Sequence, residues 1–382
     1  MSYMQGRVAH DADSHVMETR EWLDAYVDAE YSGKLRSLYG KERTQLDDLL
    51  DQAKQRKTDA EADARAAENP IAGPKGWLAY GAFDPQERSR VLDDLGFASQ
   101  LVFPTAGIGP VTAARDDATR YAASRAYNRA VAAFAADDER LIPVAYVPLD
   151  DPDAALAGIQ AALADGCGAI SFSNAAPADR SPGHPVYDPI WALLSERDVP
   201  FMLHIGAGTK TQPKPFRNNG RERAPDLHGG GENLRFCDYM MLWYAPQMFL
   251  TALVYDGVFM RHPELRGGVI ESAAGWVPDF LRQLDRAHKS FGRTDPYLQE
   301  LDLLPSEYIR RAVKFTPFPG EDVGQMIRDA GAELFLFSSD YPHPEGTKDP
   351  FGRFERSLEG IDEAAKDKFY RANFEQMMGM GA

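Results

Sequence analysis

Cysteine is scarce in this chain, and a signal-like leader is missing. Only two cysteines occur in 382 residues, Cys167 and Cys237, and their spacing is typical neither of a zinc knuckle nor of a disulfide framework. The first six residues have neither the basic nor the apolar region of a signal peptide. The cytoplasm, a reducing compartment, is therefore the expected location.

Basic residues are also in deficit. The chain has 42 Lys and Arg against 58 Asp and Glu, a formal net charge of −16. Because nucleic acids are bound by clustered Lys and Arg, this balance argues against a nucleic-acid partner. The one long uncharged stretch, residues 239–255, is interrupted by Pro246 and is too short to span a membrane. Its Met and aromatic content indicates a buried helix or a subunit contact, so we expect a homodimer or larger homo-oligomer.

What the chain does have is a regular alternation of strand-like and helix-like segments. The strand-like segments begin near residues 7–15 and continue at 97–103, 141–147, 169–172, 199–204, 268–271, 313–316 and 334–337. Helical spacing is clear at 117–136, 153–164 and 189–196. Eight strands separated by helices predict an α/β fold, a (β/α)8 TIM barrel with helical and loop insertions, as a single domain over residues 1–382.

Two segments exceed a minimal barrel. A helical insertion is expected around residues 28–80, and its charged, Ala-rich composition is typical of a solvated helical excursion. Residues 206–235 are rich in Gly, Pro, Asn and Arg and directly follow the strand that ends at His204. We expect them to form a lid or substrate wall, in which His228 either contacts substrate or faces solvent.

Carboxylate and imidazole side chains recur where the predicted strands end. Asp13 and His15 are two residues apart and so share one face of the first strand, His204 ends the fifth, and Asp340 follows the eighth. Barrel enzymes keep their chemistry at the carboxyl ends of their strands, and a divalent metal accepts this ligand mixture. The sequence therefore predicts a metalloenzyme, although a helix cap, a core histidine and a polar turn are the ordinary alternatives.

Three more residues are candidates beside this set. Glu271 ends a buried strand, where a carboxylate is costly unless it is paired, so it is either a metal ligand or a proton-transfer group. Glu18 is either a ligand, a neighbour of the metal or an acid in a first helical turn. His343 is either an acid–base group, a second ligand or an exposed loop histidine. If two ions bind, Glu271 or Glu18 would bridge them.

Several phrases of the sequence resemble one family. They are His184-Pro185-Val186-Tyr187-Asp188-Pro189-Ile190-Trp191, His204-Ile205-Gly206, residues 261–266, residues 271–278 and the Ser-Asp-Tyr-Pro-His run at 339–343. Over residues 7–26 and 84–380 the chain resembles the amidohydrolase-related (amidohydrolase 2) enzymes, which include aminocarboxymuconate-semialdehyde decarboxylase and the aromatic acid decarboxylases. The resemblance implies a (β/α)8 barrel with a divalent metal held by Asp13, His15, His204 and Asp340.

Two positions depart from the family pattern. The first-strand pair is Asp-x-His rather than His-x-His or Glu-x-His, and Glu271 stands where the decarboxylases present a catalytic histidine. Harder carboxylate ligands favour manganese, iron or magnesium. The expected cofactor is a divalent metal ion, zinc, manganese or iron, present as one ion or two.

These features predict a hydrolase or non-oxidative decarboxylase that acts on a small organic acid, ester or amide. Glu271 and His343 are the expected proton-transfer residues. The excess of carboxylates beside three histidines also matches a dinuclear non-haem iron, or iron/manganese, oxygenase on the same fold. A third hypothesis is a non-catalytic structural subunit of a heteromeric enzyme, against which the intact ligand set argues.

Overall fold

The polypeptide forms two compact units in the computed structural model. The structure describes residues 3–38, 44–208, 213–222 and 236–380. The first unit contains residues 1–169 and 338–353, and the second unit contains residues 170–337 and 354–382. That residues 1–382 act as a single domain stays a prediction.

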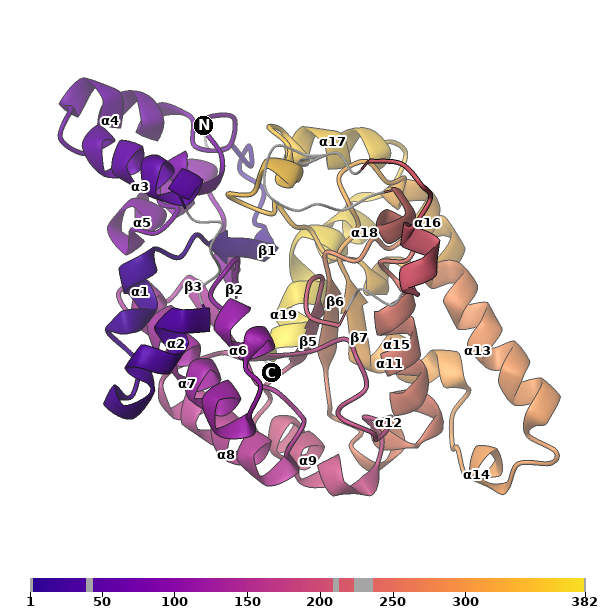
Figure 1. Cartoon of the computed structure of the whole chain (residues 1–382). Helices are drawn as coiled ribbons and strands as arrows, with labels where there is room; N and C mark the ends of the chain where they lie inside the picture. The colour runs from indigo at the N-terminus through magenta and orange to yellow at the C-terminus, as the bar shows by residue number, and fades with distance from the viewer. Residues whose placement is uncertain (1–2, 39–43, 209–212, 223–235, 381–382) are drawn as a thin grey trace. The chain divides into compact units, whose positions relative to one another are not determined.

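Three parallel strands form the sheet of the first unit (Figure 1). They are β1 (His10–Val16), β2 (Ser99–Pro104) and β3 (Leu141–Tyr146), paired in that order. Every residue of β1 is buried, as expected for a parallel strand that is covered on both faces. The β1–β2 register shifts between Asp11 and Ser14, so the strand is irregular around Asp13.

Three of the helices named here for the first unit, α5 (Pro85–Leu95), α7 (Asp117–Ala135) and α8 (Pro152–Ala164), begin at aspartate caps. The others are α1 (Arg20–Asp24) and α6 (Gly109–Ala113). The carboxylates of Asp84, Asp116 and Asp151 accept first-turn N–H groups of α5, α7 and α8. The helices predicted at 117–136 and 153–164 are confirmed.

The insertion after β1 is helical but not simply solvated. It contains α2 (Ser32–Leu38), α3 (Thr44–Arg56) and α4 (Ala60–Glu68), and α3 and α4 lie beside α5 (Figure 1). Arg56 forms a bidentate ion pair with Glu87 at 3.0 and 2.9 Å and reaches Asp63 at 2.7 Å. Leu50 and Ala53 of α3 are buried. Most other described residues of α3 and α4 are exposed or half-buried, and composition alone does not reveal which of their charges find partners.

Four parallel strands form the sheet of the second unit. They are β4 (Ala169–Phe172, whose first residue belongs to the first unit), β5 (Phe201–His204), β6 (Gly267–Ile270) and β7 (Val313–Phe315), paired in that order. Between them lie α9 (Asp188–Glu196), α10 (Phe236–Tyr239), α11 (Tyr244–Tyr255), α12 (Val258–Arg261), α13 (Val277–Phe291), α14 (Pro296–Gln299) and α15 (Pro305–Ala312). The alternation of parallel strands and helices confirms the α/β class.

The eighth predicted strand, residues 334–337, is less regular in the structure than the other seven. The described residues here form isolated β-bridges only, Phe315 with Phe335 and Ser14 with Tyr341. The N–H of Leu336 donates to the carbonyl of Phe315 in β7 at 2.9 Å, whereas the N–H of Phe337 donates to the carbonyl of Phe369 at 2.9 Å. The segment is buried as its apolar residues indicate, but its hydrogen-bond partner could not be read from them. The remaining helices are α16 (Val323–Ala330), α17 (Pro350–Ser357), α18 (Glu363–Asp367) and α19 (Asn373–Met378).

The predicted lid at 206–235 lies mostly outside the described residues, and so does His228. Its described part holds one short 3-10 helix, Lys214–Arg217, so the lid stays a prediction. Within the described ranges, no helix combines the length and the apolar character needed to cross a membrane.

Candidate metal centre

Four ionisable side chains meet in the first unit at the carboxyl end of β1. Nε2 of His15 lies 3.3 Å from Oδ1 of Asp13 and 3.4 Å from Oδ1 of Asp340. That Asp340 oxygen is 3.0 Å from Nδ1 of His343. The rings of His15 and His343 stack with their centroids 3.8 Å apart, and all four residues are buried. The structure thus brings together four of the residues predicted from the ends of two separate segments.

A backbone carbonyl fixes the tautomer of His15. Its Nδ1 lies 2.9 Å from the carbonyl oxygen of Pro104, which can only accept a hydrogen bond. Nδ1 therefore carries a hydrogen, and Nε2 is the ring nitrogen directed at the carboxylates of Asp13 and Asp340. Carboxylate oxygens that face one ring nitrogen are stabilised when a cation, either a metal ion or a proton, lies among them. This orientation is the one that metal-ligating histidines adopt.

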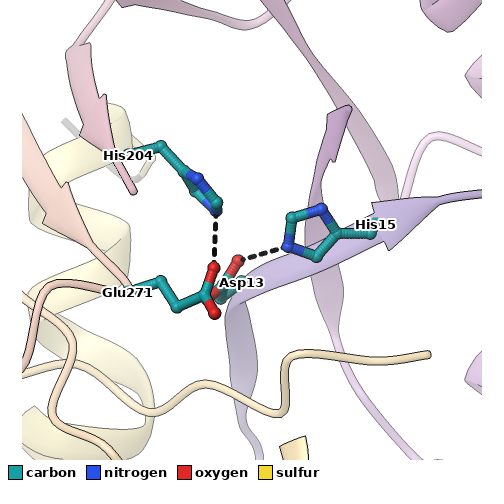
Figure 2. Close-up of side chains that lie close together, drawn as sticks. All are labelled: Asp13, His15, His204 and Glu271. Atoms are coloured by element: carbon teal, nitrogen blue, oxygen red, sulfur yellow. Dashed lines mark ion pairs between the residues drawn. The ribbon is translucent and has the colours of Figure 1, made fainter. Parts of the chain in front are cut away.

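His204 and Glu271 repeat this arrangement in the second unit (Figure 2). Nδ1 of His204 is 2.8 Å from the carbonyl oxygen of Ile205, and its Nε2 faces Oε2 of Glu271 at 3.5 Å. The side-chain amide of Asn174 donates to the carbonyl of His204 at 2.7 Å and holds the end of β5. Each unit therefore directs an imidazole Nε2 at a carboxylate, as the dashed lines of Figure 2 mark.

Two of the candidate carboxylates are carried on left-handed backbone. The φ angle is 53° at Glu271 and 54° at Asp340, a region that costs non-glycine residues about 1–3 kcal/mol. Hydrogen bonds hold both conformations: Glu271 N–H donates to Oγ1 of Thr316 at 2.8 Å, and Asp340 N–H donates to the carbonyl of Asp13 at 2.8 Å. Such strain clusters at functional sites, where the surrounding structure imposes it.

Asp11 was not singled out from the sequence, yet it organises the first-unit group. Its carboxylate accepts hydrogen bonds from Ser339 N–H at 2.8 Å, from Ser339 Oγ at 2.6 Å and from Gln100 Nε2 at 2.7 Å. Burial raises the pKa of Asp11 to about 7, and these hydrogen bonds oppose the rise. The signal in the sequence was the alternation of Asp11 with Asp13, but its partners are known only from the fold.

The two predicted accessory residues of the first unit have several partners. His343 places Nε2 2.9 Å from Oγ1 of Thr105, so its two ring nitrogens face Thr105 and Asp340. Glu18 accepts N–H groups of Thr105 at 3.1 Å and of Ala106 at 2.8 Å, while burial raises the pKa of Glu18. Glu18 thereby anchors the loop after β2. Its role as a metal ligand stays a prediction.

A matching anchor stands in the second unit. The carboxylate of Glu321 accepts N–H groups of Ala274 at 3.0 Å, Gly275 at 2.7 Å and Phe318 at 2.7 Å. These bonds tie the loop that follows Glu271 to the loop after β7. Glu321 could not be predicted from the sequence because it binds backbone N–H groups, which every residue type except proline carries.

The donor groups fit a divalent cation. Within the first unit, His15, Asp340 and His343 each offer a ligand atom within 4.8 Å of the others. Oδ1 of Asp340 is buried and accepts no hydrogen bond from the described residues, which a bound cation would compensate. Imidazole nitrogen with carboxylate oxygen is a set that manganese, iron and zinc all accept.

Comparison with known proteins identifies the family. The family model described as Amidohydrolase matches residues 11–377. The chain belongs to the amidohydrolase family. Among curated proteins none matches.

Solved structures of this amidohydrolase fold cover almost the whole chain. An amidohydrolase from Mycobacterium avium subsp. paratuberculosis K-10 is 20% identical with a TM-score of 0.74 and covers 98% of both chains. The 2,6-dihydroxybenzoate decarboxylase from Rhizobium is 20% identical with a TM-score of 0.61, covering 99% of this chain and 100% of its own. A dihydroxybenzoic acid decarboxylase from Polaromonas sp. JS666, solved with manganese and 2-nitroresorcinol, is 17% identical with a TM-score of 0.62 and covers 98% of both chains. The likeness confirms the predicted TIM-barrel-like α/β fold.

Proposed function

We propose that this protein is a metal-dependent enzyme that decarboxylates a small aromatic acid without an oxidant. The observation that carries the proposal is the paired tautomer geometry: carbonyl-anchored His15 and His204 each direct Nε2 at a carboxylate. Membership of the amidohydrolase family supports the presence of a metal ion. The manganese in the Polaromonas structure supports manganese as that ion. Decarboxylation is favoured over hydrolysis because the structural neighbours named by their activity are decarboxylases.

The proposed metal ligands are the residues that the sequence predicts. Asp13, His15 and Asp340 of the first unit and His204 of the second are the proposed ligands. Once bound, the ion would polarise oxygen atoms of the substrate and offset their negative charge. The hydrogen bonds of Asp11 and of the Asp340 backbone hold the first-unit ligands in place.

Glu271 is the proposed proton-transfer residue. Its carboxylate is buried and faces Nε2 of His204, and its backbone is fixed by Thr316. A carboxylate in such a site can hold a proton on Oε2 and release it to a substrate carbon or oxygen. For His343 we propose a supporting proton-transfer role, in which its bond to Thr105 must break before Nε2 can accept a proton.

The decisive experiment measures metal and product on one preparation. Protein purified without added metal should contain about one divalent ion per chain by mass spectrometry. Manganese-loaded protein should release carbon dioxide from a panel of hydroxybenzoates. A loaded protein that hydrolyses aryl esters or amides but releases no carbon dioxide would support the hydrolase alternative. Two iron atoms per chain, with consumption of dioxygen, would support the oxygenase alternative.

The homodimer predicted from the sequence is retained as part of the proposal. The segment that suggested it, α10 with α11, exposes Tyr239, Met240, Tyr244 and Met248 by 46, 58, 44 and 55%. Apolar and aromatic side chains exposed together are typical of a surface that another protein chain covers. The expected cytoplasmic location likewise stays a prediction.

A further inference from the structure

Lys75 turns its amine into the first unit. The residue as a whole is only partly covered, yet its Nζ is buried and has no hydrogen-bond acceptor among the described residues. Lysine normally buries its methylene stem and keeps the ammonium in water. A buried ammonium without an acceptor is costly and needs an explanation. Burial accordingly lowers the pKa of Lys75 to about 8, and the attraction of Asp340 opposes that change.

The turn that carries Lys75 is fastened to both segments of the candidate centre. Gly76 N–H donates to the carbonyl of Pro342 at 2.8 Å, two residues beyond Asp340. Trp77 Nε1 donates to the carbonyl of Glu18 at 3.1 Å, just after β1. The insertion therefore delivers Lys75 to the group that contains Asp340, and neither bond involves the Lys75 side chain.

The protein's own groups do not explain the inward amine. Nζ lies over the ring of Tyr341, 5.4 Å from the centroid, and the guanidinium of Arg88 lies 5.1 Å from the same centroid. A cation–π contact recovers only part of the hydration that a buried ammonium gives up. In the described part of the chain Lys75 forms no ion pair, since Asp340 acts on it only as a nearby charge.

The other buried cation nearby, Arg88, binds backbone through two guanidinium nitrogens, while its Nη1 is buried without a hydrogen-bond partner among the described residues. Arg88 donates through Nε to the carbonyl of Gly81 at 2.8 Å and through Nη2 to the carbonyl of His15 at 2.5 Å. It therefore holds backbone. Two aspartates neutralise a divalent ion, so the metal with its first-unit ligands would attract an acidic substrate only weakly. An ammonium beside them supplies the missing positive charge.

We propose that Lys75 is a substrate-binding residue whose ammonium holds the carboxylate of the molecule on which the metal centre acts. The inference rests on the proposed function, because it takes the substrate to be an acid. A charge-assisted hydrogen bond to a carboxylate would satisfy the buried amine and orient the ligand at the same time. Family resemblance did not point to this residue, since it lies in the insertion outside the resembling segments.

Calorimetric titration of manganese-loaded protein tests the proposal. The probes are 2,6-dihydroxybenzoate, benzoate and resorcinol, the last being the first compound without its carboxylate. Lys75→Met keeps the apolar stem and removes the charge. The variant should therefore bind both carboxylates at least tenfold more weakly than the wild type, and resorcinol less than twofold more weakly. Lys75→Arg should restore most of the affinity. Lys348→Met, which removes an exposed nearby charge, is the matched control and should leave both carboxylates unaffected.

Three outcomes would overturn the proposal: carboxylate affinity unchanged in Lys75→Met, equal weakening of resorcinol and 2,6-dihydroxybenzoate, or a wild type that binds neither carboxylate. Metal content measured on every sample separates this inference from the proposed function. A wild type that holds no metal, but whose carboxylate affinity still depends on Lys75, would reject the metalloenzyme and leave the anion-binding role standing.

Discussion

The backbone N–H of Asp340 donates to the carbonyl oxygen of Asp13 at 2.8 Å, so two candidate ligands far apart in the sequence are joined by one hydrogen bond. The next residue repeats the contact, because His15 N–H donates to the carbonyl of Tyr341 at 2.7 Å. The chain after residue 339 is thus aligned along β1. The spacing of the two carboxylates is set by the backbone, and such preorganisation is what a tight metal site requires.

Removal of a ligand should empty the site without unfolding the protein. We expect Asp340→Ala and His204→Ala each to lower bound metal to below about a tenth of the wild-type content, because a lost direct ligand costs more than the 10–100-fold typical of the residues that support a ligand. Metal is measured by mass spectrometry and folding by circular dichroism. His262→Ala removes a histidine outside the proposed ligand set and is the control. Full metal occupancy in both ligand variants would contradict the assignment.

Two variants of Asp11 should show whether its hydrogen bonds or its negative charge support the site. Asp11→Ala leaves two Ser339 donors and Gln100 Nε2 without their acceptor, which should cost about 2–4 kcal/mol of unfolding free energy and weaken manganese binding. Asp11→Asn should retain most of the unfolding free energy and most of the manganese affinity. The amide oxygen still accepts from Ser339, and Gln100 can turn its Oε1, which is buried without a partner, toward the new amide N–H.

Manganese electron paramagnetic resonance and urea unfolding check these two variants together. A merely structural role would change stability while leaving the spectrum of the bound ion as in the wild type. Equal damage by Asn and Ala would show that the charge of Asp11, and not its hydrogen-bonding shape, is what matters.

The sequence indicates those site residues whose position follows from a strand end. His204 and Asp340 come after apolar runs, and the carboxyl ends of parallel strands gather at one edge of a sheet. Asp11 and Lys75 act through Ser339 and Pro342, partners that local patterns do not specify. The eighth strand is irregular, and this irregularity could not be predicted for the same reason. An apolar run predicts that Phe337 is buried, but it does not predict that the N–H of Phe337 donates to the carbonyl of Phe369.

Lys314 gives a pH dependence of stability. It lies on β7, its Nζ donates to the carbonyl of Glu333 at 2.7 Å, and burial lowers its pKa from 10.5 to about 8. Between those two values the unfolded chain binds a proton that the folded chain does not, so unfolding free energy should rise with pH across this window. Below pH 8 the penalty is complete, at roughly 3 kcal/mol from the size of the shift.

Lys314→Met should therefore be more stable than the wild type at pH 7, by about 2 kcal/mol after loss of one hydrogen bond. The difference should shrink as pH rises from 8 to 10. Lys368→Met, which removes an exposed neighbouring charge, is the control. Urea unfolding at several pH values provides the measurement, and a gain that does not change with pH would refute the explanation.

The exposed face of α10 and α11 should be covered in solution. Light scattering is expected to give twice the chain mass of 42.3 kDa at micromolar concentration. Met248→Lys places a charge in the middle of this face and should shift the mass toward the monomer, while Met380→Lys, at a residue that is 39% exposed elsewhere, should not. A wild type that is monomeric at these concentrations would show that the face serves another purpose.

Glu271→Gln separates the two enzyme hypotheses. In a single-metal decarboxylase or hydrolase the carboxylate of Glu271 serves proton transfer, so the amide should abolish turnover, by roughly 10²–10⁴-fold, and leave the metal content unchanged. In a two-metal oxygenase a carboxylate shared by both ions offsets their repulsion, so the amide should lose about one ion of two. Because Gln keeps the size of Glu and the backbone bond to Thr316, folding is not expected to confuse the result. Metal content and activity are to be measured on the same preparation, and an unchanged content in a chain that holds one ion would reject the dinuclear site.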